Sequence, residues 1–385
     1  MIGNAVPLSR PAISRDDIDA VVGVLNTPTL SLGPNLTAFE HELAAYAGTR
    51  HGVGVNSGTS GLHVALAAAG VGAGDEVITS PFSFVASANC AIYLGARPVF
   101  ADIDEATLGL DPATVEAAIT ERTRAIVPVD VFGQPCRIDD IVDIARRHGL
   151  AVVRDACEAI GAERAGVRVG VSTQGDATVF AFYPNKQMTT GEGGMVVTDD
   201  AEMAAAMRSM ANQGRDDAGT WMNHVRLGYN YRLDEMSAAL GRSQLARLDA
   251  ILANRARVAA WYDERIAGID GVSAPVVVPE TTRMSWFVYV VRLDPSVDRE
   301  ALMTALAADG IPSRPYFVPI HLQPYYRERY GYGPGDFPVT ERVAGSTLAL
   351  PFFTEMTEDD VDRVCDRIVT RLAGSVRREG AGVHA

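Results

Sequence analysis

The sequence predicts an α/β protein with a mainly parallel central sheet, helices on both faces and a smaller C-terminal α+β domain. Between residues 76 and 153, short apolar segments alternate with segments of helical period, which is typical of parallel strands joined by helical crossovers. A chain of 385 residues is long for a single core, so two domains are expected. A long helical stretch at 234–267 separates them, giving a large domain at 1–250 and a small domain at 251–385.

The N-terminal segment is expected to be an arm laid over the large domain. Prolines surround one expected helix at 14–25. Ser14 is a favourable N-cap, and Asp16 and Asp17 place negative charge in the first turn, where the helix dipole favours it. A second helix, at 39–47, leads into the sheet.

The remaining elements follow from the change between apolar runs and helical periodicity. In the large domain we expect strand 76–80, helix 84–94, strand 98–101, helix 112–119, strand 125–129, helix 138–148 and strand 151–153. In the small domain we expect strands 272–278 and 286–293 and helices 299–308 and 358–372.

Composition narrows the class of protein. The net charge of −14, without any run of basic residues, argues against a nucleic-acid partner. No stretch of 18 apolar residues and no basic-then-apolar leader occurs, so we expect a cytoplasmic protein with no membrane partner. The cysteines are scattered without Cys-x-x-Cys spacing, which favours reduced thiols over disulfides or a metal site. They are Cys90, Cys136, Cys157 and Cys365.

Lys186 is the only lysine in the chain, and every other basic side chain apart from histidine is arginine. It lies in a turn between two apolar segments, 180–182 and 195–198, with a glycine cluster at 191–194. Only an amine can lose its proton near neutral pH and condense with a carbonyl, so this position predicts a Schiff-base lysine. The alternative is a surface lysine in a glycine-rich hairpin.

A carboxylate upstream indicates which carbonyl Lys186 would hold. Asp155 ends the apolar segment 151–153. Pyridoxal 5′-phosphate (PLP) needs an acid at its ring nitrogen, so that the protonated ring can accept electrons from the substrate carbon. A helix cap is the alternative role for Asp155.

A third motif supplies an expected phosphate site. An apolar strand at 52–55 runs into Ser57, Gly58 and Thr59 and then into a helix. Backbone N–H groups and hydroxyls at such a helix start bind phosphate. The motif is neither a Walker loop nor GxGxxG, and many ordinary strand-to-helix turns look the same.

These motifs together resemble the DegT/DnrJ/EryC1/StrS family of PLP-dependent nucleotide-sugar aminotransferases, in particular its perosamine-synthetase-like members. The resemblance covers about residues 5–375 and rests on six motifs in order. They are Ser-Gly-Thr, Phe-Ser-Phe-Val-Ala-Ser-Ala-Asn (82–89), Pro-Val-Phe-Ala-Asp-Ile-Asp (98–104), Asp-Ala-Cys-Glu-Ala-Ile-Gly-Ala (155–162), Lys186 with Gly-Glu-Gly-Gly, and Leu-Gly-Tyr-Asn-Tyr-Arg-Leu (227–233). The implied fold is PLP fold type I, the aspartate aminotransferase fold.

The resemblance also assigns roles. It implies that Lys186 is the catalytic amine and Asp155 the partner of the ring nitrogen, that Gly58 and Thr59 bind the phosphate, and that Phe84 stacks on the ring. Asn230 matches an asparagine that reaches the phosphate across a dimer interface, so a homodimer with shared active sites is implied.

Two positions depart from the family pattern. Many relatives have a serine phosphate ligand where this chain has Ala181. Relatives often have Gln or His where Glu158 stands, near the phenolic oxygen of the cofactor. A carboxylate there would either share a proton with that oxygen or repel its charge.

The substrate side of the site is expected in the segment 311–326, which is rich in proline and aromatic residues. Matching positions in relatives border the sugar site, which implicates Tyr316 and His321; a surface loop with core aromatics is the alternative. Tyr183 is expected to face the cofactor or the sugar, or to pack. Trp221 could meet the nucleotide or belong to the core.

The expected reaction is transfer of an amino group from L-glutamate to C4 of a dTDP-linked 4-keto-6-deoxyhexose, as the resemblance implies. Amination at C3, a GDP or UDP sugar, and an aminocyclitol remain open. The family's sugar 3-dehydratases replace the lysine with histidine, so Lys186 argues against that chemistry. A non-catalytic protein of the same fold is the remaining alternative.

Overall fold

The computed structural model describes residues 5–216 and 222–381 of the chain. Its centre is a seven-stranded sheet in the order β1-β9-β8-β5-β4-β2-β3. Only β9 runs antiparallel to its neighbours, so the sheet is mainly parallel, as predicted. Its strands are β1 (His51–Val55), β2 (Glu76–Thr79), β3 (Arg97–Phe100), β4 (Thr123–Val127), β5 (Ala151–Asp155), β8 (Ala177–Ala181) and β9 (Gly194–Thr198).

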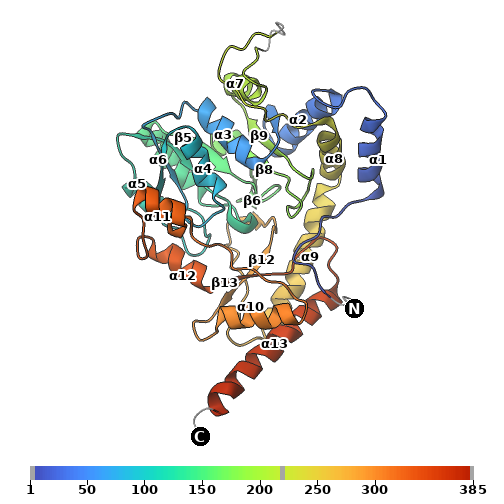
Figure 1. Ribbon diagram of the computed structural model, residues 1–385, viewed down its shortest axis with the longest axis vertical. Helices are drawn as coiled ribbons and strands as arrows, with labels where there is room; N and C mark the ends of the chain where they lie inside the picture. Colours follow the sequence, from blue (N-terminus) through green and yellow to red (C-terminus); the bar gives the residue numbers. More distant parts are fainter. Residues whose placement is uncertain (1–4, 217–221, 382–385) are drawn as a thin grey trace.

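Helices cover both faces of this sheet (Figure 1), because successive side chains of each strand point to opposite sides. Val77, Val153 and Val179 pack toward one layer of helices, and their neighbours Ile78, Val152 and Phe180 pack toward the other. The first layer contains α3 (Gly58–Ala68), α4 (Ala86–Tyr93) and α7 (Ala201–Ala211). The second contains α2 (Pro34–Ala47), α5 (Pro112–Ala117), α6 (Ile138–His148) and α8 (Glu235–Ala246).

A second core lies in the C-terminal part. There an antiparallel sheet, in the order β10-β12-β13, packs against three helices. The strands are β10 (Val272–Ser273), β12 (Tyr289–Leu293) and β13 (Thr347–Leu350), and the helices are α9 (Leu248–Ile266), α10 (Arg299–Ala308) and α13 (Glu358–Ala381).

Smaller elements lie at the junction of the two cores and around the large sheet. A small sheet pairs β11 (Thr281–Arg283) with β6 (Glu163–Arg164), which also pairs with β7 (Val167–Arg168). Two C-terminal helices, α11 (Pro324–Tyr330) and α12 (Pro338–Ser346), belong to clusters that include Phe100 of the edge strand β3 and Phe82 of the turn after β2. Short 3₁₀ turns lie at Val131–Gly133, Ser172–Gln174 and Ile320–Leu322.

The N-terminal arm contacts both cores. α1 (Arg15–Leu25) begins with Ser14 as N-cap in a capping box with Asp17, and it packs on α8. The buried carboxylate of Asp17 accepts hydrogen bonds from Ser243 and Gln244 of α8. Upstream, Val6 belongs to the C-terminal core, and its N–H donates to the carbonyl of Gly310.

Two predicted elements are wrong. The stretch predicted as one helix at 234–267 is two helices, because the backbone of Arg247 leaves helical geometry (φ −118°, ψ 15°) while its side chain binds Asp17 of the arm. The strand predicted at 272–278 is only two residues long, because Pro275 has no N–H with which to continue the ladder. Within the described residues, no helix combines the length and apolarity that crossing a bilayer requires.

Candidate active site

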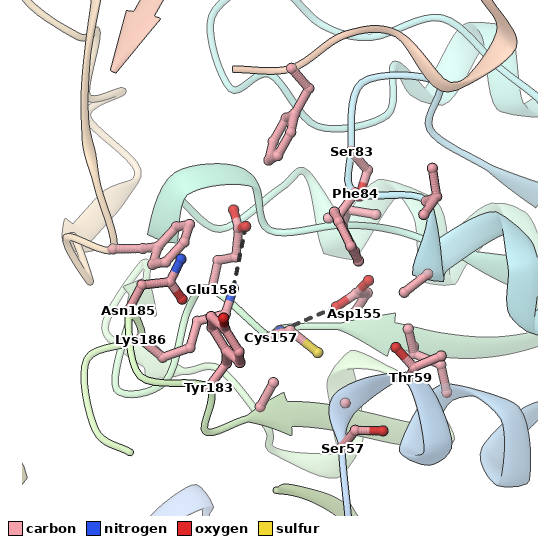
Figure 2. A pocket seen from close by; sticks show the side chains of 18 of the residues that line it. Ser57, Thr59, Ser83, Phe84, Asp155, Cys157, Glu158, Tyr183, Asn185 and Lys186 are labelled. Atoms are coloured by element: carbon pink, nitrogen blue, oxygen red, sulfur yellow. Dashed lines mark hydrogen bonds and ion pairs between the residues drawn. The ribbon is translucent and has the colours of Figure 1, made fainter. Parts of the chain in front are cut away.

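A pocket of about 630 Å³ opens at the carboxyl ends of the central strands (Figure 2), where ligands of such sheets gather. Turns after β1, β2, β5 and β8 supply one side of its wall. The segment 315–318 and Phe287, both from the C-terminal part, supply the other. The pocket therefore lies where the two cores meet.

Lys186 enters the pocket from the turn between β8 and β9. Its backbone N–H donates to the carbonyl of Tyr183 at 2.9 Å. The next side chain, Gln187, is buried and donates from Nε2 to the carbonyls of Glu158 (2.6 Å) and Ser285 (2.9 Å). These bonds fix the turn, so the lysine amine has a defined position.

The Lys186 amine has two neighbours of different kinds. Its Nζ lies 3.4 Å from Oε1 of Glu158. It also lies 3.9 Å from the centre of the Phe287 ring, within the range of a cation–π contact. The side chain is 14% exposed, so the pocket shields the amine from most of the solvent.

Asp155 ends β5 and faces the same pocket. Its Oδ1 accepts a hydrogen bond from the backbone N–H of Cys157 at 3.2 Å. Burial, with a further contribution from the nearby Glu158 carboxylate, raises the pKa of Asp155 to about 6. In the described structure no arginine or lysine makes an ion pair with this carboxylate, so a protonated nitrogen in the pocket would stabilise its ionised form.

The start of α3 forms a cradle beside Asp155. Ser57 caps the helix by accepting from the N–H of Ser60 at 3.1 Å. A Cβ on Gly58 would lie 2.8 Å from both the Cβ of Ala181 and the Sγ of Cys157, so only glycine lets this turn approach β8 so closely. The free N–H groups of the first turn and the Thr59 hydroxyl line the pocket and suit an anion.

The carboxylate of Glu158 is fixed by a backbone hydrogen bond. Its Oε2 accepts from the backbone N–H of Phe132 at 2.9 Å, and the side chain is buried. Phe132 takes a positive φ of 59° at this point. One carboxylate oxygen is thus fixed by the backbone, while the other faces Lys186.

Aromatic side chains form the outer wall. Phe84 and Tyr183 both line the pocket and are more than half exposed. Tyr316 stacks on Phe132, with ring centres 6.2 Å apart, and burial together with the Glu158 charge raises its pKa. Figure 2 shows Phe84 above Asp155, and Tyr183 beside Lys186.

The structure brings together all the predicted site residues except two. His321 is buried in the Ile320–Leu322 turn, where its Nε2 lies 3.1 Å from Oε1 of Glu341, and it does not line the pocket. Asn230 lies in an extended segment outside the pocket, and its carbonyl accepts from Asn56 at 3.4 Å. Its predicted role involves a second copy of the chain. Trp221 lies outside the described residues.

Phe287 and Asn185 line the pocket although the sequence analysis does not single them out. Phe287 belongs to an apolar segment that the sequence predicts as an ordinary strand. Its proximity to Lys186 arises only from the tertiary fold. Asn185 could have been found, since it directly precedes the lysine.

The residues of this pocket fit PLP. The Gly58 cradle suits the phosphate, and the buried Asp155 carboxylate suits a protonated ring nitrogen. The Lys186 amine projects into the same cavity and can bond to the carbonyl carbon. Phe84 offers an aromatic face on the exposed side.

Comparisons with known proteins agree with this geometry. Residues 11–369 match the DegT/DnrJ/EryC1/StrS aminotransferase family. The spore coat polysaccharide biosynthesis protein SpsC of Bacillus subtilis (strain 168) is 41% identical over 383 residues, covering 96% of this chain and 98% of that protein. The GDP-perosamine synthase of Caulobacter vibrioides is 40% identical over 362 residues, covering 93% and 96%. The solved structure of S. venezuelae DesV in complex with a ketimine intermediate has a TM-score of 0.88 and 37% identity, covering 95% and 98%.

Proposed function

Because this chain belongs to the DegT/DnrJ/EryC1/StrS aminotransferase family, and is thus a PLP-dependent sugar aminotransferase, we propose that L-glutamate is its amino donor. The proposed acceptor is the C4 keto group of a nucleotide-linked 4-keto-6-deoxyhexose. We propose dTDP as the nucleotide. GDP is the second candidate, since one relative is a GDP-perosamine synthase.

One observation carries the proposal: the only lysine of the chain lies in one pocket with a buried, unpaired carboxylate and a helix-start cradle for an anion. Each feature alone has a structural explanation. Their convergence on one cavity, contributed by separate strand ends, matches the three parts of PLP that need a protein partner.

When bound, PLP supplies an electron sink at its ring. Lys186 would hold the carbonyl carbon of the cofactor and, as the base of the pocket, would move the proton of the substrate carbon. Asp155 would keep the ring nitrogen protonated. Gly58 and Thr59 would hold the phosphate, Phe84 would cover the ring, and Glu158 would lie near the phenolic oxygen. Tyr183 and Tyr316 would border the sugar.

We also propose that the enzyme is a homodimer in which Asn230 completes the phosphate site of the second copy. The lining of the pocket supports this. Among the described lining residues, Lys186 is the one cation, whereas Asp155, Glu158 and Glu192 are acidic. Anionic substrates need further positive or hydrogen-bonding groups, which a second copy would bring. We further propose a cytoplasmic enzyme whose large and small domains meet near residue 250. His321, buried away from the pocket, is proposed only as a residue that acts indirectly on the sugar site.

A half-reaction tests the proposal. PLP-loaded enzyme is mixed with L-glutamate, the amino acid is removed, and candidate nucleotide keto-sugars are added singly while cofactor absorbance is recorded. We expect glutamate to convert the lysine-bound absorbance band, and a 4-keto-6-deoxyhexose linked to dTDP to restore it. The Lys186→Ala variant should lack the initial band.

Three outcomes would change the assignment. Recovery with the GDP sugar alone would move the nucleotide to the second candidate. A product aminated at C3, identified by NMR, would correct the position. No spectral change with glutamate, in an enzyme whose Lys186 holds PLP, would remove glutamate as donor.

A further inference from the structure

The neighbours of the Lys186 amine come from different parts of the chain. Glu158 follows β5 in the large sheet, whereas Phe287 lies two residues before the start of the C-terminal strand β12. The amine lies 3.4 Å from the carboxylate of the first and 3.9 Å from the ring centre of the second. An ammonium over an aromatic face is stabilised by the ring's negative face, and more so where water is excluded.

The backbone of Phe287 is fixed by hydrogen bonds from a buried arginine. Arg255, on α9, is 2% exposed. Its Nε donates to the carbonyl of Trp286 at 2.6 Å, and its Nη2 donates to the carbonyl of Phe287 at 2.7 Å. Its Nη1 donates to Oγ1 of Thr354 at 3.0 Å. The planar guanidinium thereby fixes two consecutive carbonyls at once.

Burying the Arg255 guanidinium costs folding free energy, which indicates that this side chain has a specific role. Within the described residues Arg255 makes no ion pair with any carboxylate, and burial lowers its pKa to about 9. A buried charge without a counter-ion is disfavoured unless its hydrogen bonds are well satisfied. An apolar side chain would fill the same volume at a lower cost in folding free energy. It could not, however, donate hydrogen bonds to the carbonyls of Trp286 and Phe287.

The 285–287 segment is also hydrogen-bonded to the turn at 132–133, and this turn positions Glu158, the other named neighbour of Lys186. The N–H of Ser285 donates to the carbonyl of Gly133 at 3.1 Å, and the N–H of Phe287 donates to the carbonyl of Phe132 at 3.4 Å. The N–H of Phe132 in turn donates to the carboxylate of Glu158. One continuous set of hydrogen bonds therefore positions the Glu158 carboxylate and the Phe287 ring.

We propose that Phe287 is a face-on partner of the Lys186 amine in this enzyme and that Arg255 is the positioning residue that holds Phe287 in place. The proposal rests on the proposed function in that Lys186 is taken as the catalytic amine. In the loaded enzyme, the Phe287 face and Glu158 would stabilise the ammonium form that the free Lys186 amine takes when it accepts the proton of the substrate carbon. Loss of the aromatic face removes this stabilisation of the ammonium form.

The lone lysine makes this directly measurable in the cofactor-free protein. An amine-reactive reagent can label only Lys186 and the α-amino group, and peptide mass spectrometry separates the two. Because only the unprotonated amine reacts, the labelling rate of Lys186 relative to the α-amino group reports its protonation. The variants are Phe287→Leu, Phe287→Tyr and Arg255→Gln. Arg265→Gln is the matched control, since Arg265 is on the same helix but pairs with Glu358 and Asp362 instead.

At pH 7.5 we expect Phe287→Leu to raise the relative labelling of Lys186 about fivefold, and Phe287→Tyr, which keeps an aromatic face, to match the unchanged protein. Arg255→Gln should reproduce the effect of Phe287→Leu. The double variant, with both substitutions, should show no higher relative labelling than Phe287→Leu alone. Labelling is repeated at increasing pH until the rate of each variant reaches a plateau, and on that plateau the ratios should approach one. Arg265→Gln should label like the unchanged protein.

A fivefold increase that persists on the high-pH plateau would show that Leu merely exposes the amine, and would overturn the proposed contact. Unchanged labelling in Arg255→Gln would overturn the positioning role. If Arg255→Gln does not fold, Arg255→Lys replaces it, because a single ammonium cannot bind both carbonyls in one plane. Failure of the proposed function would appear separately, as PLP absorbance that survives Lys186→Ala.

Discussion

At the scale of single residues, Asp155 shows how a site residue can oppose the stability of its own fold. Burial holds the pKa of this carboxyl at about 6, against an ordinary value of 3.8. Below pH 3.8 both the folded and the unfolded chain carry it protonated, and no cost arises. Above pH 6 the folded chain must keep a buried charge, which costs up to about 3 kcal/mol.

We therefore expect Asp155→Asn to stabilise the cofactor-free protein at pH 8 while nearly abolishing transamination, because an amide cannot keep the ring nitrogen protonated. Urea unfolding at several pH values checks this. The gain in unfolding free energy should be up to about 3 kcal/mol at pH 8 and should shrink toward zero near pH 4. A variant that is less stable at pH 8, or equally stabilised at both pH values, would contradict it.

The residues of the pocket differ in how far the sequence could predict them. Lys186 and Asp155 could be found because their side-chain chemistry is unusual for their positions: a lone amine, and a carboxylate after an apolar strand. Phe287 and Arg255 could not, since an apolar residue in a strand and an arginine on a helix are ordinary locally. Their roles depend on contacts between residues far apart in the chain.

At the scale of elements, the placement of α3 depends on one glycine. Gly58 lets the helix start approach Ala181 and Cys157, and any Cβ there would be 2.8 Å from both. Gly58→Ala should push the first turn away from the pocket and weaken PLP binding by about tenfold or more, since the N–H groups proposed to bind the phosphate would move with it. Titration of the cofactor-free enzyme with PLP, followed by absorbance, measures the affinity.

The matched control for this substitution is Gly23→Ala. Gly23 lies in α1 with nothing within 4 Å of an added Cβ, so alanine should stabilise that helix by about 0.5–1 kcal/mol without affecting PLP affinity. Equal PLP affinities for the Gly58→Ala variant and the unchanged enzyme would show that the cradle is not the phosphate site.

Regular helices were the elements that the sequence predicted best. The predicted ranges 138–148 and 299–308 match α6 and α10, because each has an amphipathic pattern and clear end signals. The break between α8 and α9 had no such signal. Arg247 leaves the helix because its side chain reaches the arm, which is more than 200 residues away in the sequence.

At the scale of the whole molecule, exposed apolar side chains lie in the segment just before Asn230. Leu227 is 79% exposed, and Val225 is also more than half exposed. If a second copy covers them, Leu227→Glu should convert a dimer into a monomer, because a buried carboxylate would have no partner. PLP affinity should fall about tenfold with it, since Asn230 of the second copy would be lost.

Light scattering and PLP titration of the same sample test both parts. Val276→Glu provides the control, because Val276 is also exposed but belongs to the C-terminal part. A Leu227→Glu variant that remains dimeric with unchanged affinity would place the interface elsewhere.

The packing of the first residues has a consequence for the order in which the chain can fold as it leaves the ribosome. The strands of the central sheet all lie between residues 51 and 198, so that sheet can assemble while synthesis continues. The C-terminal core cannot. It requires Val6, the N–H of Phe352 bonded to the carbonyl of Leu8, and α13 near the end of the chain. Residues 6–8 therefore acquire these partners only after residues 352–368 have been synthesised, and the pocket between the two cores can form only from that point on.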